Sequence, residues 1–201
     1  MLGRIARSLI PSPVRREFRN RLLRRRLKDK PVRIVIGASG VFEAGWIPTD
    51  SDQLNLLEPE TWARFLEVDS IDAILAEHVW EHLTFAEGMQ AAATCFRYLK
   101  PGGRVRVAVP DGLFPDPEYQ EYIKVGGAGG GLLHPGHLVV YTYASLREVF
   151  ESAGFSTVLL EYHDEQGNFH GVDWSIAEGM IHRSRRFDDR GPISIVMDAI
   201  K

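Results

Sequence analysis

The chain has 201 residues, of which 44% are hydrophobic and 25% are charged, and this size and composition are typical of a single globular domain. It contains no apolar stretch of about 18 residues, and its N-terminus lacks the apolar core of a signal peptide, so we expect a protein that neither spans a membrane nor is exported. The single cysteine, Cys95, has no partner for an internal disulfide, which favours a reducing, cytoplasmic location.

The net charge of −3 hides a strongly basic N-terminal segment. Residues 1–30 hold 11 of the 24 Lys and Arg but only two of the 27 Asp and Glu, so this segment carries +9 and the rest of the chain −12. We therefore divide the chain into a basic segment, 1–30, and a domain, 31–201.

The basic segment has the pattern of an amphipathic helix over residues 12–28. A serine and a proline at its start are typical helix-initiating residues, and Val14, Phe18 and Leu22 follow at intervals of four. Three interpretations are open: the apolar stripe packs on the acidic domain, the helix makes a peripheral contact with an anionic membrane or a protein, or it binds nucleic acid. Nucleic acid is the least favoured, because the segment has no series of aromatic residues between its arginines, only Phe18, and no RNA-binding motif.

From residue 31 onward the chain alternates between strand and helix patterns. Apolar, β-branched runs predict strands at 32–37, 45–50, 71–78, 104–110, 156–164 and 192–201. Helical periodicity predicts helices at 59–68, 84–100 and 143–155. Pro48 restricts the second strand to the margin of a sheet, because proline cannot donate a ladder hydrogen bond. A strand, a helix and a parallel strand in succession form the crossover unit of an open α/β sheet.

The sequence KPGG at 100–103 separates a predicted helix from the strand after it. Pro101 cannot continue a helix, and Gly102 and Gly103 adopt positive φ angles readily, so we expect the chain to reverse here. The glycine-rich stretch within 112–140 is longer than a connector needs, and we expect a lid or binding loop there.

Polar residues gather where the predicted parallel strands end. They are the turn 37–40, Asp50, Glu77, His78 and Asp111. Ligands of open α/β sheets bind beyond the carboxyl ends of the strands, so the sequence predicts a binding site at this edge.

Four motifs, taken in order, resemble the class I S-adenosylmethionine-dependent methyltransferases, in particular a small uncharacterised bacterial group of predicted methyltransferases. They are VRIVIGASG leading to GWIPTD, then IDAILAEHVWEHL, then CFRYLKPGGRVRVAVPDG, then SLREVFESAGF, and the resemblance covers residues 31–201. It implies an α/β fold, Rossmann-like and doubly wound, with a mostly parallel seven-stranded sheet and flanking helices. It also implies S-adenosylmethionine as the cofactor.

The resemblance implies which residues hold the cofactor. The turn Gly37, Ala38, Ser39 and Gly40 would border its methionine part, Asp50 would accept from both ribose hydroxyls, Asn55 and Leu56 would contact the adenine, and Glu77 and His78 would border the transferred methyl group. The turn has fewer glycines than is usual in the family. This leaves open a non-catalytic protein of the same fold, an adaptor that docks through its basic N-terminal helix.

Methyl transfer from a sulfonium needs alignment and a dry site, and it needs a base only when the acceptor carries a proton of high pKa. We predict His137, Asp111 and His78 as catalytic residues, with Glu81 and His134 as further candidate bases. Glu81 and His82 are also typical of a helix start, where an acid stabilises the helix dipole. No metal motif of fixed spacing is present, so we predict no metal ion. The expected acceptor is a small molecule, and its carbohydrate-like character is implied by the resemblance alone.

Overall fold

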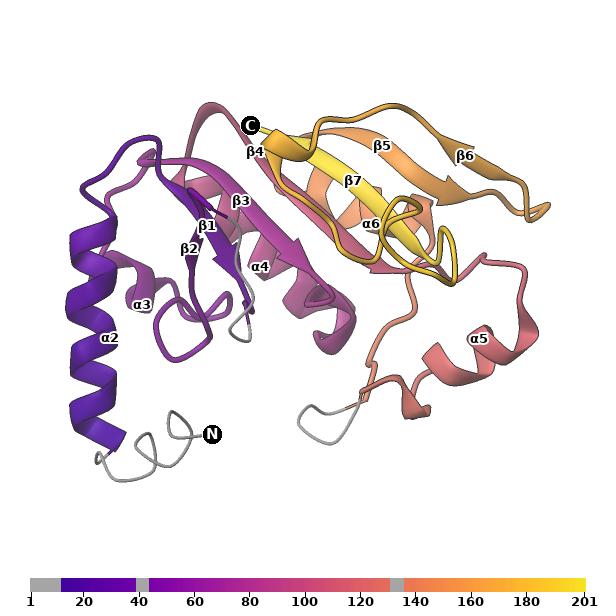
Figure 1. Ribbon diagram of the computed structural model, residues 1–201, viewed down its shortest axis with the longest axis horizontal. Coiled ribbons are helices and arrows are strands. Elements are labelled where there is room, and N and C mark those ends of the chain that lie inside the picture. The colour runs from indigo at the N-terminus through magenta and orange to yellow at the C-terminus, as the bar shows by residue number, and fades with distance from the viewer. Residues whose placement is uncertain (1–11, 39–43, 131–135) are drawn as a thin grey trace.

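The computed structural model describes residues 12–38, 44–130 and 136–201 (Figure 1). Its centre is a seven-stranded sheet of order β2-β1-β3-β4-β7-β5-β6. In chain order the strands are β1 (Arg33–Ile36), β2 (Ile47–Pro48), β3 (Ile71–Glu77), β4 (Leu99–Pro110), β5 (Ser156–His163), β6 (Phe169–Gly171) and β7 (Ser194–Ile200). The predicted strands are thus confirmed, and β2 with its proline lies at the sheet margin as expected.

Five of the strands run in one direction. The pairs β2/β1, β1/β3 and β3/β4 are parallel, whereas β4/β7, β7/β5 and β5/β6 are antiparallel. The reversed strand β7 lies between β4 and β5, so β5 points the same way as β4. The predicted α/β class is confirmed, and the seven-stranded sheet is mostly parallel because five of its strands share one direction.

The helices are mostly short and are fixed by local signals. They are α2 (Ser12–Arg26), α3 (Pro59–Ala63), α4 (Phe85–Tyr98), α5 (Pro117–Ile123) and α6 (Tyr143–Glu151), with 3-10 turns η1 (Trp80–His82), η2 (Ala128–Gly130) and η3 (Ile176–Glu178). Thr84 begins α4 with a capping box, in which its side chain accepts from the backbone N–H of Glu87 and the Glu87 carboxylate accepts from that of Thr84. The helix predicted at 59–68 is shorter than expected.

The strand side chains alternate between two apolar clusters on opposite faces of the sheet. Ile34 and Ile36 of β1 belong to the main cluster with residues of α4 and α6, while Val35 between them belongs to the second cluster. Figure 1 shows α4 and α6 behind the sheet. Trp174 and Ile181, on either side of η3, cover the second face. The helices expected on both faces of a doubly wound sheet are therefore replaced on this face, within the described residues, by an irregular segment.

The chain reversal before β4 occurs earlier than predicted. Helix α4 ends at Tyr98 instead of continuing to residue 100, and the KPGG sequence is a bulged part of β4. Gly102 has φ +77°, and a Cβ on Gly103 would approach the Lys100 carbonyl oxygen to 2.9 Å. Gly102 therefore provides the positive φ of the bulge, and Gly103 occupies a position where a side chain does not fit.

Helix α2 turns its apolar stripe outward. Val14, Phe18 and Leu22 are exposed, with Phe18 at 69%, whereas Leu23 is buried and Leu27 packs on the main cluster. The interpretation that the stripe packs on the domain is therefore wrong. The helix lies along the sheet margin that carries β2 (Figure 1). Within the described part, no helix has the length and apolar character needed to cross a bilayer.

Candidate active site

The turn after β1 requires glycine at its first position. Gly37 has φ +63°, and a Cβ there would lie 2.8 Å from Cγ2 of Val79. Ala38 is buried and donates its backbone N–H to the Thr49 carbonyl at 3.1 Å, which ties the turn to the end of β2. Ser39 and Gly40, the other two predicted turn residues, lie outside the described residues. The side-chain-free bend that a cofactor would need is present at Gly37.

The acid predicted to hold the ribose is paired with a guanidinium from α2. Nη2 of Arg19 lies 3.0 Å from Oδ2 of Asp50, and the same guanidinium reaches Asp52 at 3.1 Å and Gln53 at 2.9 Å. The side chains of Arg19 and Asp50 are 41% and 39% exposed. A pair this accessible to water is weak, and a competing ligand can replace the guanidinium. The sequence contained no signal for this contact, because its partners belong to separate segments.

The two residues predicted to contact adenine make contacts within the protein. Asn55 accepts from the backbone N–H of Leu57 at 3.0 Å and donates to Glu58 at 2.9 Å, so its side chain closes a local turn before α3. Leu56 is buried in the main cluster. Their role toward adenine stays a prediction.

Glu77 and His78 lie at the carboxyl end of β3 and contact the C-terminal part of the chain. The Glu77 carboxylate accepts from the backbone N–H groups of His182 at 3.1 Å and Arg183 at 2.6 Å. His78 has φ +54°, a conformation that is uncommon for residues other than glycine. Its Nε2 lies 3.1 Å from the hydroxyl of Ser194 at the start of β7. These partners hold the end of β3 in a fixed position.

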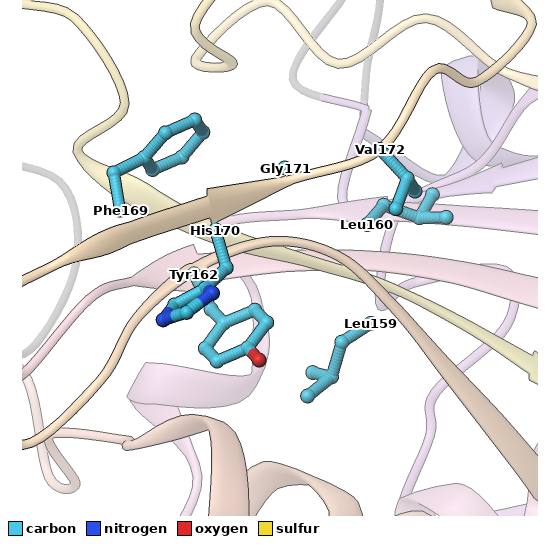
Figure 2. Close-up of a pocket in the computed structure, with 7 residues that line it drawn as sticks. All are labelled: Leu159, Leu160, Tyr162, Phe169, His170, Gly171 and Val172. Carbon is cyan, nitrogen blue, oxygen red and sulfur yellow. The ribbon is translucent and has the colours of Figure 1, made fainter.

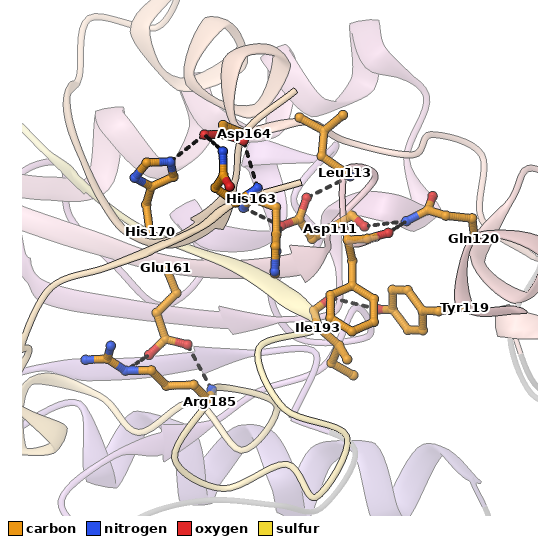
Figure 3. A network of polar contacts seen from close by, with 12 residues as sticks. Asp111, Leu113, Tyr119, Gln120, Glu161, His163, Asp164, His170, Arg185 and Ile193 are labelled. Carbon is orange, nitrogen blue, oxygen red and sulfur yellow. Dashed lines mark hydrogen bonds and ion pairs between the residues drawn. The ribbon is translucent and has the colours of Figure 1, made fainter. Parts of the chain in front are cut away.

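Asp111 is enclosed by donors at the end of β4 (Figure 3). Its Oδ2 accepts from the backbone N–H of His163 at 2.8 Å and lies 2.9 Å from the His163 Nδ1, while Oδ1 accepts from the Leu113 N–H at 2.9 Å. Burial raises the pKa of Asp111, and the hydrogen bonds from Leu113 and His163 oppose that rise. The carboxylate thus joins β4 to β5. Its predicted role as a base stays a prediction.

A second buried acid, Glu161, lies near this network (Figure 3). It accepts from the indole N–H of Trp174 at 2.8 Å and from the backbone N–H of Arg185 at 2.9 Å. These contacts attach β5 to the irregular segment that precedes β7. Glu161 therefore holds this segment in place and does not face solvent.

His137 is buried beneath η2. Its Nδ1 lies 2.8 Å from the Ile123 carbonyl oxygen, and a Cβ on Gly129 would approach its ring to 2.6 Å. A carbonyl only accepts hydrogen bonds, so Nδ1 carries the proton and Nε2 keeps a lone pair. The next residue, Leu138, donates its backbone N–H to the Glu81 carbonyl at 2.7 Å. The fold therefore brings this predicted base next to η1. The other loop histidine, His134, lies outside the described residues.

Glu81 and His82 do not begin a helix. They lie in η1, and α4 begins only after Thr84, where Glu87 supplies the acid of the capping box. Glu81 is 1% exposed, and its Oε1 lies 3.0 Å from Nδ1 of His78. The interpretation as a helix-dipole acid is therefore wrong, because the side chain is buried beside two imidazoles.

A shallow cavity of about 470 Å³ lies on β5 and β6 (Figure 2). It is lined by Leu159, Leu160, Tyr162, Phe169, His170, Gly171 and Val172. Since β6 and β2 form opposite margins of the sheet, this cavity is remote from Gly37 and Asp50. We assign it no part in methyl transfer.

Comparison with known proteins agrees with this geometry. Residues 59–107 match the family model described as a methyltransferase domain. No curated protein sequence matches the chain. A solved S-adenosylmethionine-dependent methyltransferase from Archaeoglobus fulgidus is 17% identical, with a TM-score of 0.50 over 92% of this chain and 94% of that one. A proposed O-methyltransferase from Nostoc punctiforme is also 17% identical with a TM-score of 0.50, and the match covers 96% of this chain but only 62% of that one. At this identity the two structures show a shared fold. The family match covers β3, α4 and most of β4, so the central part of the chain is similar to a methyltransferase domain and the whole described chain has the fold of these enzymes.

Proposed function

We propose that the protein transfers a methyl group from S-adenosylmethionine to a small-molecule acceptor, for which the motif resemblance favours a carbohydrate-like compound. The proposal rests on one observation: a backbone bend at Gly37 and a carboxylate at Asp50 both lie at the edge of the sheet where four parallel strands end. Gly37 lets the backbone bend at positive φ with no side chain of its own, so that the backbone can border the amino-acid part of the cofactor, and the carboxylate offers two acceptor oxygens for adjacent hydroxyls.

The cofactor supplies an electrophilic methyl group on a positively charged sulfur. The protein then has to align the acceptor in line with that bond and to exclude water. His78, fixed by Ser194 and by its strained backbone, borders the reacting position. In the neutral form of His137 the Ile123 carbonyl fixes the proton on Nδ1, so Nε2 is suited to take a proton from an acceptor hydroxyl. The cytoplasmic location expected from the sequence stays a prediction.

Calorimetry with S-adenosylhomocysteine tests the proposal. We expect binding by the wild-type chain, and we expect Asp50→Asn to weaken it by more than about tenfold, because an amide offers one acceptor oxygen in place of two. Asp52→Asn is the matched control, since it disturbs the same Arg19 guanidinium and leaves the Asp50 carboxylate in place. A folded wild-type chain that shows no binding at millimolar ligand excludes the enzyme.

The second candidate function is a non-catalytic adaptor that docks through α2. The outward apolar stripe favours it, because Val14, Phe18 and Leu22 are exposed on a helix rich in arginine. Arginines at 15 and 21 flank this stripe at the helical spacing of 100° per residue, a pattern typical of helices that lie on anionic membranes. An adaptor binds such a surface and fails to bind S-adenosylhomocysteine. A membrane-associated enzyme binds both.

A further inference from the structure

We propose that Glu81, His82 and His137 bind a divalent transition-metal ion. Within the described residues, each of these side chains offers one ligand atom, and the three atoms all lie within 4.8 Å of one another. No metal was expected from the sequence, because His137 lies far along the chain from η1 and forms no fixed-spacing motif with it. Only the fold brings the three together, by attaching the segment at Leu138 to the backbone of Glu81.

Glu81 is the strongest reason for a cation at this place. The residue is 1% exposed, and among the described residues neither carboxylate oxygen has a hydrogen bond of good geometry. The imidazole of His78, 3.0 Å away, balances the charge only when it is protonated. A buried carboxylate without donors is costly, so buried charges in proteins are paired or coordinate a metal. A cation at Glu81 would remove that cost.

The hydroxyl of Tyr141, near Glu81, also lacks a hydrogen-bond partner within the described residues. The Tyr141 phenol is buried and has no hydrogen-bond partner among the described side chains. Burial raises the pKa of Tyr141, and the nearby Glu81 charge adds to the rise, so this hydroxyl stays protonated. Two unsatisfied polar side chains in one buried place indicate a missing ion, or a missing ion with its water.

His137 is already oriented as a ligand. Its Nδ1 proton is directed at the Ile123 carbonyl at 2.8 Å, which leaves the lone pair of Nε2 for a metal. Metal-bound histidines commonly donate their other ring N–H to a carbonyl or carboxylate in this way, and the contact fixes both tautomer and ring orientation. The ring centroids of His82 and His137 are 5.4 Å apart and tilted by 60°, so the two rings converge without stacking.

The donor set selects the kind of metal. Two imidazole nitrogens and one carboxylate suit Zn²⁺, Fe²⁺, Mn²⁺ or Co²⁺, whereas Ca²⁺ and Mg²⁺ prefer sets of oxygen ligands. Three protein ligands also leave coordination positions for water or a substrate. The ion therefore has room to bind an exogenous oxygen.

A role for this ion in the reaction rests on the proposed function. With its Nε2 lone pair on the metal, His137 would hold the ion in place of acting as the base. The ion would coordinate a hydroxyl of the acceptor and lower the pKa of that hydroxyl, so that its proton leaves to water. The oxygen would then bond to the methyl carbon while the carbon–sulfur bond breaks, leaving S-adenosylhomocysteine. The predicted acceptor class is accordingly a hydroxyl compound able to coordinate a metal.

Titration of Co²⁺ into chelator-treated protein tests the site directly, because bound Co²⁺ absorbs visible light. We expect one equivalent to bind, with displacement by Zn²⁺. Glu81→Gln and His137→Ala should each weaken binding by about 100-fold or more, since a ligand contributes at least as much as its supporting partners. His170→Ala is the matched control, because this histidine also pairs with a carboxylate, Asp164 at 2.7 Å, but is exposed on β6. Circular dichroism checks that each variant is folded. If Glu81→Gln or His137→Ala does not fold, His82→Ala is measured in its place.

The outcomes separate the two proposals. Wild-type protein that takes up no Co²⁺, or variants that bind it as the control does, overturn the metal site even if S-adenosylhomocysteine binds. Co²⁺ binding that is lost in the ligand variants and kept in the control supports the site even if S-adenosylhomocysteine does not bind.

Discussion

Arg19 contacts the carboxylate that the proposed cofactor needs. Its guanidinium is 3.0 Å from Asp50 and also contacts Asp52 and Gln53, so ribose hydroxyls must compete with it. Each cofactor molecule that binds therefore has to displace or rearrange a residue from α2. The N-terminal helix is in this way coupled to occupancy of the ribose position.

Arg19→Gln should strengthen the binding of S-adenosylhomocysteine. The pair is about 40% exposed on both sides, and such pairs contribute about 0.2–1 kcal/mol, so we expect a gain of about two- to fivefold in calorimetry. Arg21→Gln is the control, because Arg21 pairs with Glu17 on its own helix. Weaker binding by Arg19→Gln than by the control variant would mean that the guanidinium supports the cofactor.

At this scale the sequence predicted which residues lie at the sheet edge better than it predicted the partners of their side chains. Gly37 and Asp50 could be found because a strand pattern places them at a sheet edge. The contacts of Glu77 with residues 182–183, and the approach of His137 to Glu81, depend on how separate segments fold together. Only the polarity of the EHVWEH sequence on a strand end signalled them, and that signal did not show which side chain is buried.

At the scale of elements, periodicity identified the strands and α4 because burial alternates or repeats along each of them. Periodicity did not identify the elements of segments that are rich in glycine or form only short helices and strands. The stretch 112–140, where a lid or binding loop is predicted, also contains the turn η2 and the helix α5, and Tyr119 and Ile123 of α5 pack in a small core with Ile193. The three-residue strand β6 was missed because its residues are exposed and follow no apolar pattern.

Helix α2 should bind anionic vesicles. Phe18 is 69% exposed, and burying it in the interface should contribute more than about 1 kcal/mol, so we expect Phe18→Ser to weaken binding by about tenfold in co-sedimentation. Val158→Ser is the control, since Val158 is an exposed apolar residue of β5. Equal binding to neutral vesicles, or equal loss in the control, would contradict the membrane contact.

At the scale of the whole molecule, one buried ion pair connects the sheet to the segment that covers its second face. The Arg106 guanidinium of β4 makes two bonds of 2.7 Å to Asp198 of β7 and donates to the carbonyls of Ser175 and Gly179. The same group lies over the Trp174 ring, 4.9 Å from its centroid. No helix covers this face within the described residues, so this charged network attaches the irregular segment to the sheet.

Arg106→Leu should lower the free energy of unfolding by about 3–5 kcal/mol, because it removes both 2.7 Å bonds to the buried Asp198 and leaves it only Arg104, 3.9 Å away. Urea denaturation measures this. Arg104→Leu is the control: Arg104 pairs with Glu178 at 2.9 Å, but both are partly exposed, and the loss should stay below about 1 kcal/mol. The double variant Arg106→Leu, Asp198→Leu should recover part of the loss. Equal effects of Arg106→Leu and Arg104→Leu would show that the buried pair is dispensable.

The position of β7 has a consequence for synthesis. This strand comes after every other strand in the sequence, yet it alone joins β5 and β6 to the rest of the sheet. During translation the early strands β1, β3 and β4 can associate as they leave the ribosome, but the β5/β6 pair has no strand that connects it to them until residues 194–200 have emerged. A stalled nascent chain would therefore expose the pairing edges of β4 and β5 together, and chaperones would be needed most at that moment.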